Sequence, residues 1–324
     1  MTKRSSGWVN FEKRIPVFLE ELIIFLLILS PILNIIFFKI FNFPKGTLFY
    51  VLMVPLTLIS LTLLWGVFTG TCTVVIKQHV SDLKGLKKKF RIVFFADLHV
   101  APFRRKKFVE RVVEKINNLR ADLIFLGGDF ISGKDDDIKY LTPLGKLEAN
   151  FPIVAVLGNH DYGIGTSFDT PNEDLAKKVA RKLRSLGIKV LRNTNLKVNF
   201  DKETLYIVGI DDLWAGHDNI EKAFKGINVR RPIIVLVHNL DLVKKLRGKK
   251  VEILLAGHTH GRFVRVPFSG EILPPLENTQ LESKYVEGFH KFGRIPMFVT
   301  SGLGESFTRI RIFDPPEIII CDLK

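Results

Sequence analysis

Residues 155–161, with the sequence AVLGNHD, constrain this chain more than any other stretch. A short apolar strand ends at Gly158 and is followed by an amide, an imidazole and a carboxylate in consecutive positions (Asn159, His160 and Asp161). Three adjacent polar side chains cannot all face a core, so they must line a loop, a turn or a site. Taken alone, the stretch fits a plain turn as well as it fits a site.

The same arrangement follows four other apolar segments, residues 91–96, 122–127, 232–237 and 251–256, which are typical of buried strands. The carboxyl ends of strands form the ligand crevice of α/β sheets, so we expect the five strand ends to converge. A capped turn or a core histidine explains any one of them singly, but not all five together. Five of the eight histidines lie among the polar residues that follow these strands: Asp97, His99, Asp129, Asn159, His160, His238, His258 and His260.

Between these strands, residues 108–119 and 175–186 carry apolar side chains at helical spacing. Strands that alternate with amphipathic helices predict an α/β domain of layered sheets and helices. We assign this domain to residues 91–324 and the preceding residues 1–90 to a separate N-terminal unit.

The mixed Asp, His and Asn donors favour a divalent metal of intermediate hardness, such as Mn²⁺, Fe²⁺, Zn²⁺ or Co²⁺. Ca²⁺ prefers oxygen alone, and structural Zn²⁺ prefers thiolates. The donors are too many for one ion, whereas two ions bridged by one carboxylate would use them all. Such a pair activates water and neutralises phosphoryl oxygens, which indicates chemistry at phosphorus.

In order and spacing, five blocks of this sequence resemble the motifs of the calcineurin-like metallophosphoesterase family. The resemblance covers roughly residues 90–324 and implies a four-layer αββα sandwich. The blocks are Asp97-Leu-His99, Gly128-Asp129, residues 158–161, His238 and residues 257–260.

The resemblance also implies a role for each polar residue of these blocks. Asp129 would bridge two metal ions. His160 would lie beside them, stabilise the phosphoryl oxygens and protonate the leaving group. The remaining ligands divide into two sets, Asp97, His99 and His260 for one metal, and Asn159, His238 and His258 for the other.

Further segments (residues 186–191, 209–212, 302–304, 309–311 and 316–318) resemble the membrane-anchored bacterial branch of the family. This branch includes a UDP-2,3-diacylglucosamine pyrophosphatase of lipid A synthesis, which implies a lipid-linked phosphorylated substrate at the cytoplasmic face. Two alternatives remain open: a broad-specificity phosphodiesterase or phospholipid phosphatase, and a non-catalytic, metal-stabilised membrane scaffold.

The sequence departs from the family pattern at two places. Ser132 stands where many members carry an aspartate that orients the catalytic histidine, and a serine cannot stabilise an imidazolium as a carboxylate does. Asp161 or the acidic run 135–137 is a candidate replacement. The last histidine block continues with Arg262 where the branch has Gly-Gly-Gln, and we predict that Arg262 contacts phosphate. Arg104 and Arg105 are further candidate substrate contacts, with a charged helix start as the alternative.

The first 76 residues hold two apolar runs, 22–38 and 46–76, joined by a short link with the turn signal Pro44-Lys45-Gly46. A helix needs about 20 apolar residues to cross a bilayer, so the pattern predicts a transmembrane helical hairpin. Lys and Arg are more frequent on both flanks than in the link, which predicts that both ends face the cytoplasm. The protein is therefore expected in the inner (cytoplasmic) membrane, with its catalytic domain in the cytoplasm.

The net charge of +15 predicts an acidic partner. Lys87–Lys89 are either a solvated charge run or a patch that faces anionic headgroups. Nucleic acid is not expected, because no aromatic–basic array or groove-reading module accompanies the charge. The two cysteines, Cys72 and Cys321, cannot form a disulfide framework.

Overall fold

The fold is described from a computed structural model of the 324-residue chain. The structure describes residues 17–40, 46–81, 89–100, 104–165, 169–200, 203–262, 265, 279–305 and 310–323. Of the predicted basic run, Lys87 and Lys88 lie outside the described residues.

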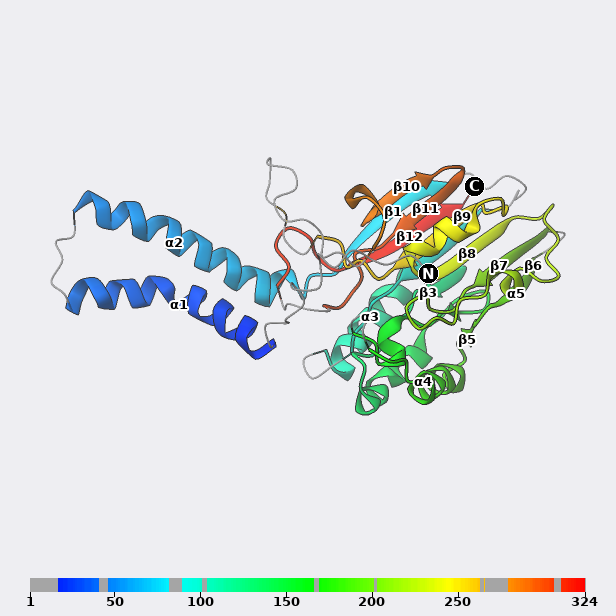
Figure 1. The fold of residues 1–324 in the computed structure, drawn as a ribbon, viewed down its shortest axis with the longest axis horizontal. Helices are drawn as coiled ribbons and strands as arrows, with labels where there is room; N and C mark the ends of the chain where they lie inside the picture. The colour runs from blue at the N-terminus through cyan, green and yellow to red at the C-terminus, as the bar shows by residue number, and fades with distance from the viewer. Residues whose placement is uncertain are drawn as a thin grey trace, which may run out of the picture.

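Two N-terminal helices extend away from the remainder of the chain (Figure 1). They are α1 (Val17–Ile40) and α2 (Thr47–Trp65), and α2 continues into a π-helical turn, η1 (Gly66–Gly70). The helices lie side by side: the Ser60 hydroxyl donates to the Leu27 carbonyl at 2.9 Å. By length and composition, one described helical segment, Phe49–Gly70, is able to cross a membrane, and the apolar segment Phe25–Ile40 is shorter. The transmembrane hairpin stays a prediction.

The remaining strands form two six-stranded sheets. The first has the order β1-β12-β2-β3-β4-β5, and the second has the order β10-β11-β9-β8-β7-β6. The strands of the first sheet are β1 (Val75–Ser81), β2 (Phe90–Phe95), β3 (Leu123–Leu126), β4 (Val154–Ala155), β5 (Lys189–Val190) and β12 (Glu317–Leu323). Those of the second are β6 (Thr194–Phe200), β7 (Glu203–Gly209), β8 (Ile233–Asn239), β9 (Ile253–Gly257), β10 (Gly288–Phe292) and β11 (Ile295–Val299).

Strand β1 belongs to the first sheet although it precedes residue 90. It pairs in parallel with β12 along its whole length, from Val75 opposite Glu317 to Ser81 opposite Leu323. The predicted division after residue 90 therefore falls within β2, after its first residue, and the N-terminal unit contributes the edge strand β1 to the first sheet.

Three apolar clusters account for the packing. The cluster between the sheets includes Phe94 of β2 and Leu236 of β8, both fully buried. On the outer face of the first sheet lie α3 (Lys106–Asn117) and α4 (Glu173–Ser185), whose buried residues recur every three or four positions. The outer face of the second sheet is covered by α5 (Ile220–Ala223) and the 3₁₀ segment η4 (Leu240–Leu246). The predicted α/β sandwich with two sheets is confirmed.

The five predicted strands are present, but they are divided between the sheets: β2, β3 and β4 lie in the first, and β8 and β9 in the second. The strand boundaries differ from the predicted ones by one or two residues, and the difference at the end of β8 affects a ligand. β8 was expected to end at residue 237 but extends to Asn239, because an irregularity between Leu236 and Asn239 lets Asn239 pair with Gly257 of β9. His238 therefore lies on a strand, where neighbouring strands hold its backbone.

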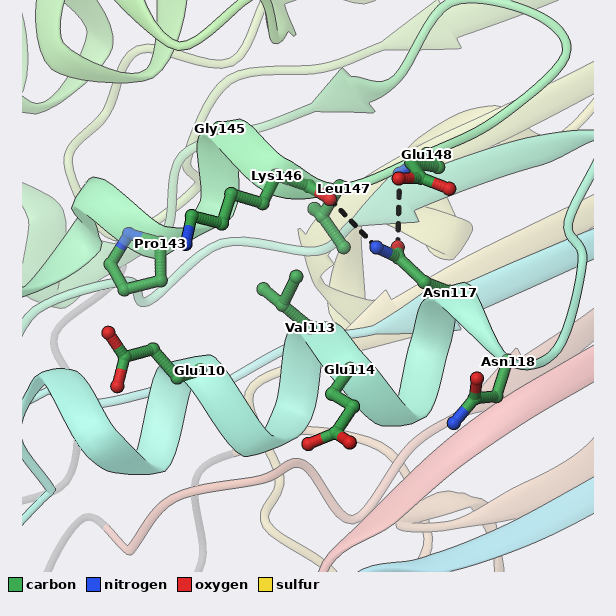
Figure 2. A pocket seen from close by; sticks show the side chains of 10 residues that line it. All are labelled: Glu110, Val113, Glu114, Asn117, Asn118, Pro143, Gly145, Lys146, Leu147 and Glu148. Carbon is green, nitrogen blue, oxygen red and sulfur yellow. Dashed lines mark hydrogen bonds between the residues drawn. The ribbon is translucent and has the colours of Figure 1, made fainter.

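Helix α3 and the 3₁₀ segment η2 (Asp135–Lys146) line a surface groove of about 650 Å³ (Figure 2). Asn117 links the two sides of the groove: its side chain donates to the Lys146 carbonyl at 2.8 Å and accepts the Glu148 N–H at 3.0 Å. Glu110, Glu114 and Glu148 contribute carboxylates to the lining, and none of the predicted metal ligands does. An acidic groove of this kind disfavours an anionic ligand.

Candidate metal centre

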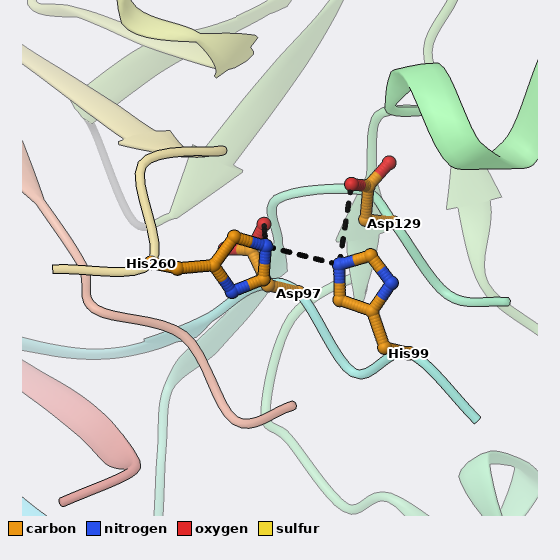
Figure 3. Close-up of side chains that lie close together, drawn as sticks. All are labelled: Asp97, His99, Asp129 and His260. Carbon is orange, nitrogen blue, oxygen red and sulfur yellow. Dashed lines mark hydrogen bonds and ion pairs between the residues drawn. The ribbon is translucent and has the colours of Figure 1, made fainter. Parts of the chain in front are cut away.

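Four buried side chains converge at the ends of β2, β3 and β9 (Figure 3). One ligand atom from each of Asp97, His99, Asp129 and His260 lies within 4.8 Å of the others. His99 Nε2 is 3.1 Å from His260 Nε2 and 3.4 Å from Asp129 Oδ2, and His260 Nε2 is 3.6 Å from Asp97 Oδ1. These residues form the first ligand group.

A second ligand group lies on the other side of Asp129. His238 Nε2 is 3.2 Å from Asp129 Oδ2 and 3.1 Å from Asn159 Oδ1. His258 Nδ1 is 3.0 Å from the same Asn159 oxygen and 3.2 Å from His238 Nε2. Asp129 Oδ2 therefore faces a histidine of each group, and the structure brings all seven predicted ligands together.

The donor set fits divalent cations. Two atoms bound at about 2.0–2.2 Å to one ion lie roughly 3.0–3.6 Å apart for angles of about 90–110°. The individual distances given above for the two groups fall in the same range, 3.0 to 3.6 Å. Asp97 and Asp129 are almost fully buried, and burying two carboxylates is costly unless cations neutralise them. Both groups mix nitrogen and oxygen, as metals of intermediate hardness prefer.

The backbone at the strand ends is strained. Five of the seven ligands have a positive φ, between 42° and 76°: Asp97, His99, Asp129, His258 and His260. A residue in the left-handed region costs about 1–3 kcal/mol and persists only where the surroundings enforce it, most often at functional sites. Asp and His tolerate this region better than bulkier residues do, so the ligand types also suit the sharp turns after each strand.

Glycines allow the loops to approach the ligands closely. A Cβ atom at Gly158 would lie 2.2 Å from Asp129 Oδ1. A Cβ atom at Gly302 would lie 2.6 Å from the Cβ of Asp97, and one at Gly304 would lie 2.7 Å from the Cβ of His99. The Gly302-Leu-Gly304 segment thus covers the first ligand group, a role that the sequence analysis did not assign to it.

Asp161 connects the loops instead of orienting an imidazole. Its Oδ2 accepts the N–H groups of Gly158 and Asp129 at 2.9 and 3.0 Å, and its Oδ1 accepts that of Phe130 at 2.9 Å. These bonds join the 3₁₀ segment η3 (Asn159–Tyr162) to the loop after β3. Both carboxylate oxygens are therefore occupied by backbone donors.

Electrostatic coupling between the ligands is strong. Burial would raise the pKa of Asp129, but His238 and His160 outweigh it and hold the pKa well below its usual range. Burial lowers the pKa of His99 to about 3, and the neighbouring His160 adds to the effect. In Asp129 and His99 these shifts favour an ionised carboxylate and a neutral imidazole, the forms that bind metal ions.

His160 lies at the edge of the centre. Its ring is 4.6 Å from that of His99, nearly perpendicular to it, and its backbone N–H donates to Asp129 Oδ1 at 2.9 Å. Unlike the ligands, which are buried, His160 is half-buried. On the other side, the half-buried Trp214 ring lies 4.6 Å from the ring of His258.

The three predicted arginines differ in burial and in their partners. Arg104 is buried and paired with Glu305, Arg105 is exposed at the start of α3, and half-buried Arg262 contacts Glu287 at 3.2 Å.

A polar network that the sequence did not reveal supports η3. The Tyr162 hydroxyl donates to Asp211 Oδ1 at 2.7 Å and accepts from Arg192 at 2.7 Å. Arg192 also donates to Asp211 Oδ2 at 2.7 Å and to Glu173 at 2.9 Å. Asp211 lies in the segment 209–212 that the sequence analysis singled out only by resemblance.

Comparison with known proteins agrees with this geometry. The sequence profile of the calcineurin-like phosphoesterases matches residues 90–262. The chain is 30% identical to phosphodiesterase YaeI of Escherichia coli, over 77% of this chain and 87% of the relative. It is 31% identical to the uncharacterized metallophosphoesterase YkuE of Bacillus subtilis (72% and 79%). It is 28% identical to the UDP-2,3-diacylglucosamine pyrophosphatase LpxG of Chlamydia muridarum (72% and 85%).

Proposed function

Because the chain belongs to the calcineurin-like phosphoesterase family, whose members are metal-dependent hydrolases, we propose that it is a membrane-anchored enzyme acting on a lipid-linked phosphoester or pyrophosphate. The most specific form of the proposal is hydrolysis of UDP-2,3-diacylglucosamine to the lipid monophosphate and UMP. In this proposal the sandwich is the four-layer αββα arrangement of the family, and the catalytic domain comprises residues 91–324 together with β1.

The observation that carries the proposal is the position of Asp129. Its Oδ2 is 3.4 Å from His99 and 3.2 Å from His238, so one carboxylate serves both ligand groups. Asp97, His99 and His260 would hold one ion, and Asn159, His238 and His258 the other. When bound, two such ions neutralise phosphoryl oxygens and lower the pKa of water; Mn²⁺ is the ion that we expect.

The remaining steps belong to the protein side chains. His160 lies beside the first ligand group and is more accessible than the ligands, which suits contact with a phosphoryl oxygen and proton donation to the leaving group. Asp161 and the Tyr162–Asp211 pair hold the backbone on either side of His160. Arg262 is the arginine that we retain as a substrate contact, because it lies two residues after the last ligand, His260.

Two findings support a lipid-linked substrate and a membrane location. Helices α1 and α2 expose large apolar side chains, such as Phe37 at 48% and Leu58 at 60% of their surface, which water disfavours. The relatives from two Chlamydia species are pyrophosphatases of a diacylated sugar nucleotide. We place the hairpin in the inner membrane and the catalytic domain at its cytoplasmic face, next to anionic headgroups.

A second candidate function is a broader phosphodiesterase activity. It is favoured by the similarity to YaeI, which is named as a phosphodiesterase and matches over a larger share of both chains than LpxG does.

The deciding experiment uses the full chain in detergent or nanodiscs, stripped of metal and then supplied with Mn²⁺. It is given UDP-2,3-diacylglucosamine and, separately, bis(p-nitrophenyl) phosphate. Release of UMP at a much higher kcat/KM than diester cleavage supports the pyrophosphatase. Diester cleavage alone supports the phosphodiesterase. His160→Ala should lower both rates by roughly 10²–10⁴, whereas His79→Ala on edge strand β1 should not. Equal rates for wild type and His160→Ala would reject the assigned catalytic residue.

A further inference from the structure

We infer that the residues joining α2 to the sandwich form a rigid joint at the bilayer surface, which holds the metal centre at a fixed height above the headgroups. The inference rests on the membrane anchoring proposed above. The joint consists of the π-helical turn Gly66–Gly70 and residues 310–313. Its partner is the interfacial layer of a phospholipid bilayer.

The helix backbone contacts the sandwich directly in this joint. The Gly66 carbonyl accepts the N–H of Arg311 at 3.2 Å. A Cβ atom at Gly66 would lie 2.8 Å from Ile312 Cγ1, and one at Gly70 would lie 1.9 Å from the Arg311 carbonyl oxygen. Only glycines permit this approach, and π-helical turns are frequent at functional positions. A flexible tether would require neither feature.

The side chain of Arg311 continues the contact to the metal centre. It is fully buried and donates to the carbonyls of Ser301 at 2.7 Å, Gly304 at 2.8 Å and Asp314 at 3.1 Å. Ser301 directly precedes the segment that covers the first ligand group, and Gly304 is its last residue. The Gly304 N–H donates to the Asp97 carbonyl. One buried guanidinium therefore separates the base of α2 from a metal-ligand loop.

Arg104 provides a second, independent connection. It donates to the Thr71 carbonyl at 2.6 Å and to Glu305 Oε2 at 2.7 Å. Thr71 directly follows η1, and Glu305 directly follows the segment that covers the ligands. Arg104 is 8% exposed, so these bonds are sheltered from water. Its position explains why it does not join the other predicted substrate contacts.

Exposed aromatic side chains on and next to the joint support the bilayer interface as its partner. Trp65 and Phe313 lie with ring centroids 5.5 Å apart and are 39% and 51% exposed, and Phe68 is 67% exposed. Phe313 has a φ of 56°, a conformation that bulky residues rarely adopt. A strained backbone persists only where surrounding interactions stabilise it. Insertion of the Phe313 ring into the interface would provide such an interaction, since aromatic rings are enriched where a helix leaves the bilayer. The patch is continuous with the apolar surface of α2.

Depth measurements test the interfacial position. In full-length Cys72→Ser protein, Phe313→Cys carries a fluorophore, and the nanodisc lipids carry a quencher near the headgroup. The matched control is Val229→Cys, which is also exposed but lies on the loop before β8. We expect at least a twofold loss of fluorescence at position 313 and none at 229. Equal fluorescence at both positions would overturn the interfacial assignment.

Spin-label distances test the rigidity of the joint. One pair is Val51→Cys on α2 and Glu110→Cys on α3, and the control pair within the sandwich is Glu110→Cys and Arg181→Cys on α4. A rigid joint predicts distance distributions of similar width for the two pairs. A distribution several times broader for the α2–α3 pair would show a tether and overturn the inference.

Activity then separates this inference from the proposed function. Phe313→Ser with Phe68→Ser should lower turnover of the lipid-embedded substrate at least tenfold and leave the soluble diester unaffected. If the variant turned over each substrate as fast as the wild type, the joint would not contribute to catalysis on the lipid-embedded substrate. If the wild-type protein cleaves neither substrate, the proposed function fails, whereas the quenching and distance measurements still decide the joint.

Discussion

At the scale of single residues, Asp129 contacts both ligand groups and His160. One of its oxygens faces both ligand groups, and the other accepts the N–H of His160. Burial alone would favour the protonated acid, yet His238 and His160 keep the pKa well below its usual range. The Asp129 side chain is therefore ionised, and we expect its negative charge as well as its shape to matter at this position.

The substitution Asp129→Asn tests this expectation, because it keeps the shape and removes the charge. We expect the metal content, measured by mass spectrometry after dialysis, to fall below one ion per chain. Diester hydrolysis should fall by roughly 10²-fold or more, because even the mutation of residues that only contact a metal ligand lowers activity by about 10- to 100-fold. The control Asp135→Asn alters an exposed aspartate paired with Lys178 and should change neither quantity. Full metal content in Asp129→Asn would contradict the bridging role.

Asp161 offers a prediction on stability. In Asp161→Asn, the amide group that replaces Oδ2 would face the N–H donors of Gly158 and Asp129, or Oδ1 would lose its own bond from Phe130. Each buried donor left without an acceptor costs about 1–3 kcal/mol. Urea unfolding should show a loss of that order, whereas the exposed Asp136→Asn should stay within about 0.5 kcal/mol of wild type. An unchanged midpoint for Asp161→Asn would mean that these bonds add no net stability.

At the scale of elements, the strand ends were predictable and the supports behind them were not. An apolar run followed by Asp97 or His258 identifies a strand and its loop, because both features are local in sequence. Asp161 and Gly304 act through contacts with segments 30 or more residues away, such as that of Asp161 with Phe130 and that of Gly304 with Asp97. Contacts between such distant segments cannot be predicted from the spacing of residues in the sequence.

The same distinction explains the differences in strand boundaries. β8 extends to Asn239 because its neighbour β9 supplies a partner through an irregular register, which the run of apolar residues does not encode. β1 was not predicted because its first two residues, Val75 and Ile76, continue the apolar run 46–76 that was assigned to a helix. Its pairing with β12 joins segments more than 200 residues apart.

Gly158, between β4 and η3, gives a prediction for an element junction. In Gly158→Ala, the new Cβ would lie 2.2 Å from Asp129 Oδ1 and 2.7 Å from His238 Cγ, so the Asp129 carboxylate must move. We expect diester hydrolysis to fall by about 10²-fold or more, because displacements near 1 Å have effects of that size. Gly187→Ala has open space but a φ of 83°. It should cost about 1 kcal/mol in stability and leave the activity intact. Similar activities for both variants would reject the steric argument.

At the scale of the whole molecule, the candidate metal centre lies where residues of the two sheets meet. Asp97, His99 and Asp129 follow strands of the first sheet, whereas His238 lies on a strand of the second and His258 and His260 follow one. At this seam two carboxylates and several imidazoles are buried close together. Ions bound there stabilise only the folded chain, because the unfolded chain does not assemble both groups.

Metal removal should therefore lower the stability of the whole sandwich and not only its activity. At free metal near 100 times Kd, binding contributes about 2.7 kcal/mol per site, which for a domain of this size corresponds to a fall in Tm of roughly 5–10 °C for each ion that chelation removes. Calorimetry of the full chain in detergent, with EDTA and then with excess Mn²⁺, measures the fall and its reversal. Asp129→Asn supplies the control, since a protein that binds little metal should respond weakly to EDTA. If wild type and Asp129→Asn lost the same number of degrees, the chelator would be acting elsewhere, and the two sheets would owe their contact to the apolar core alone.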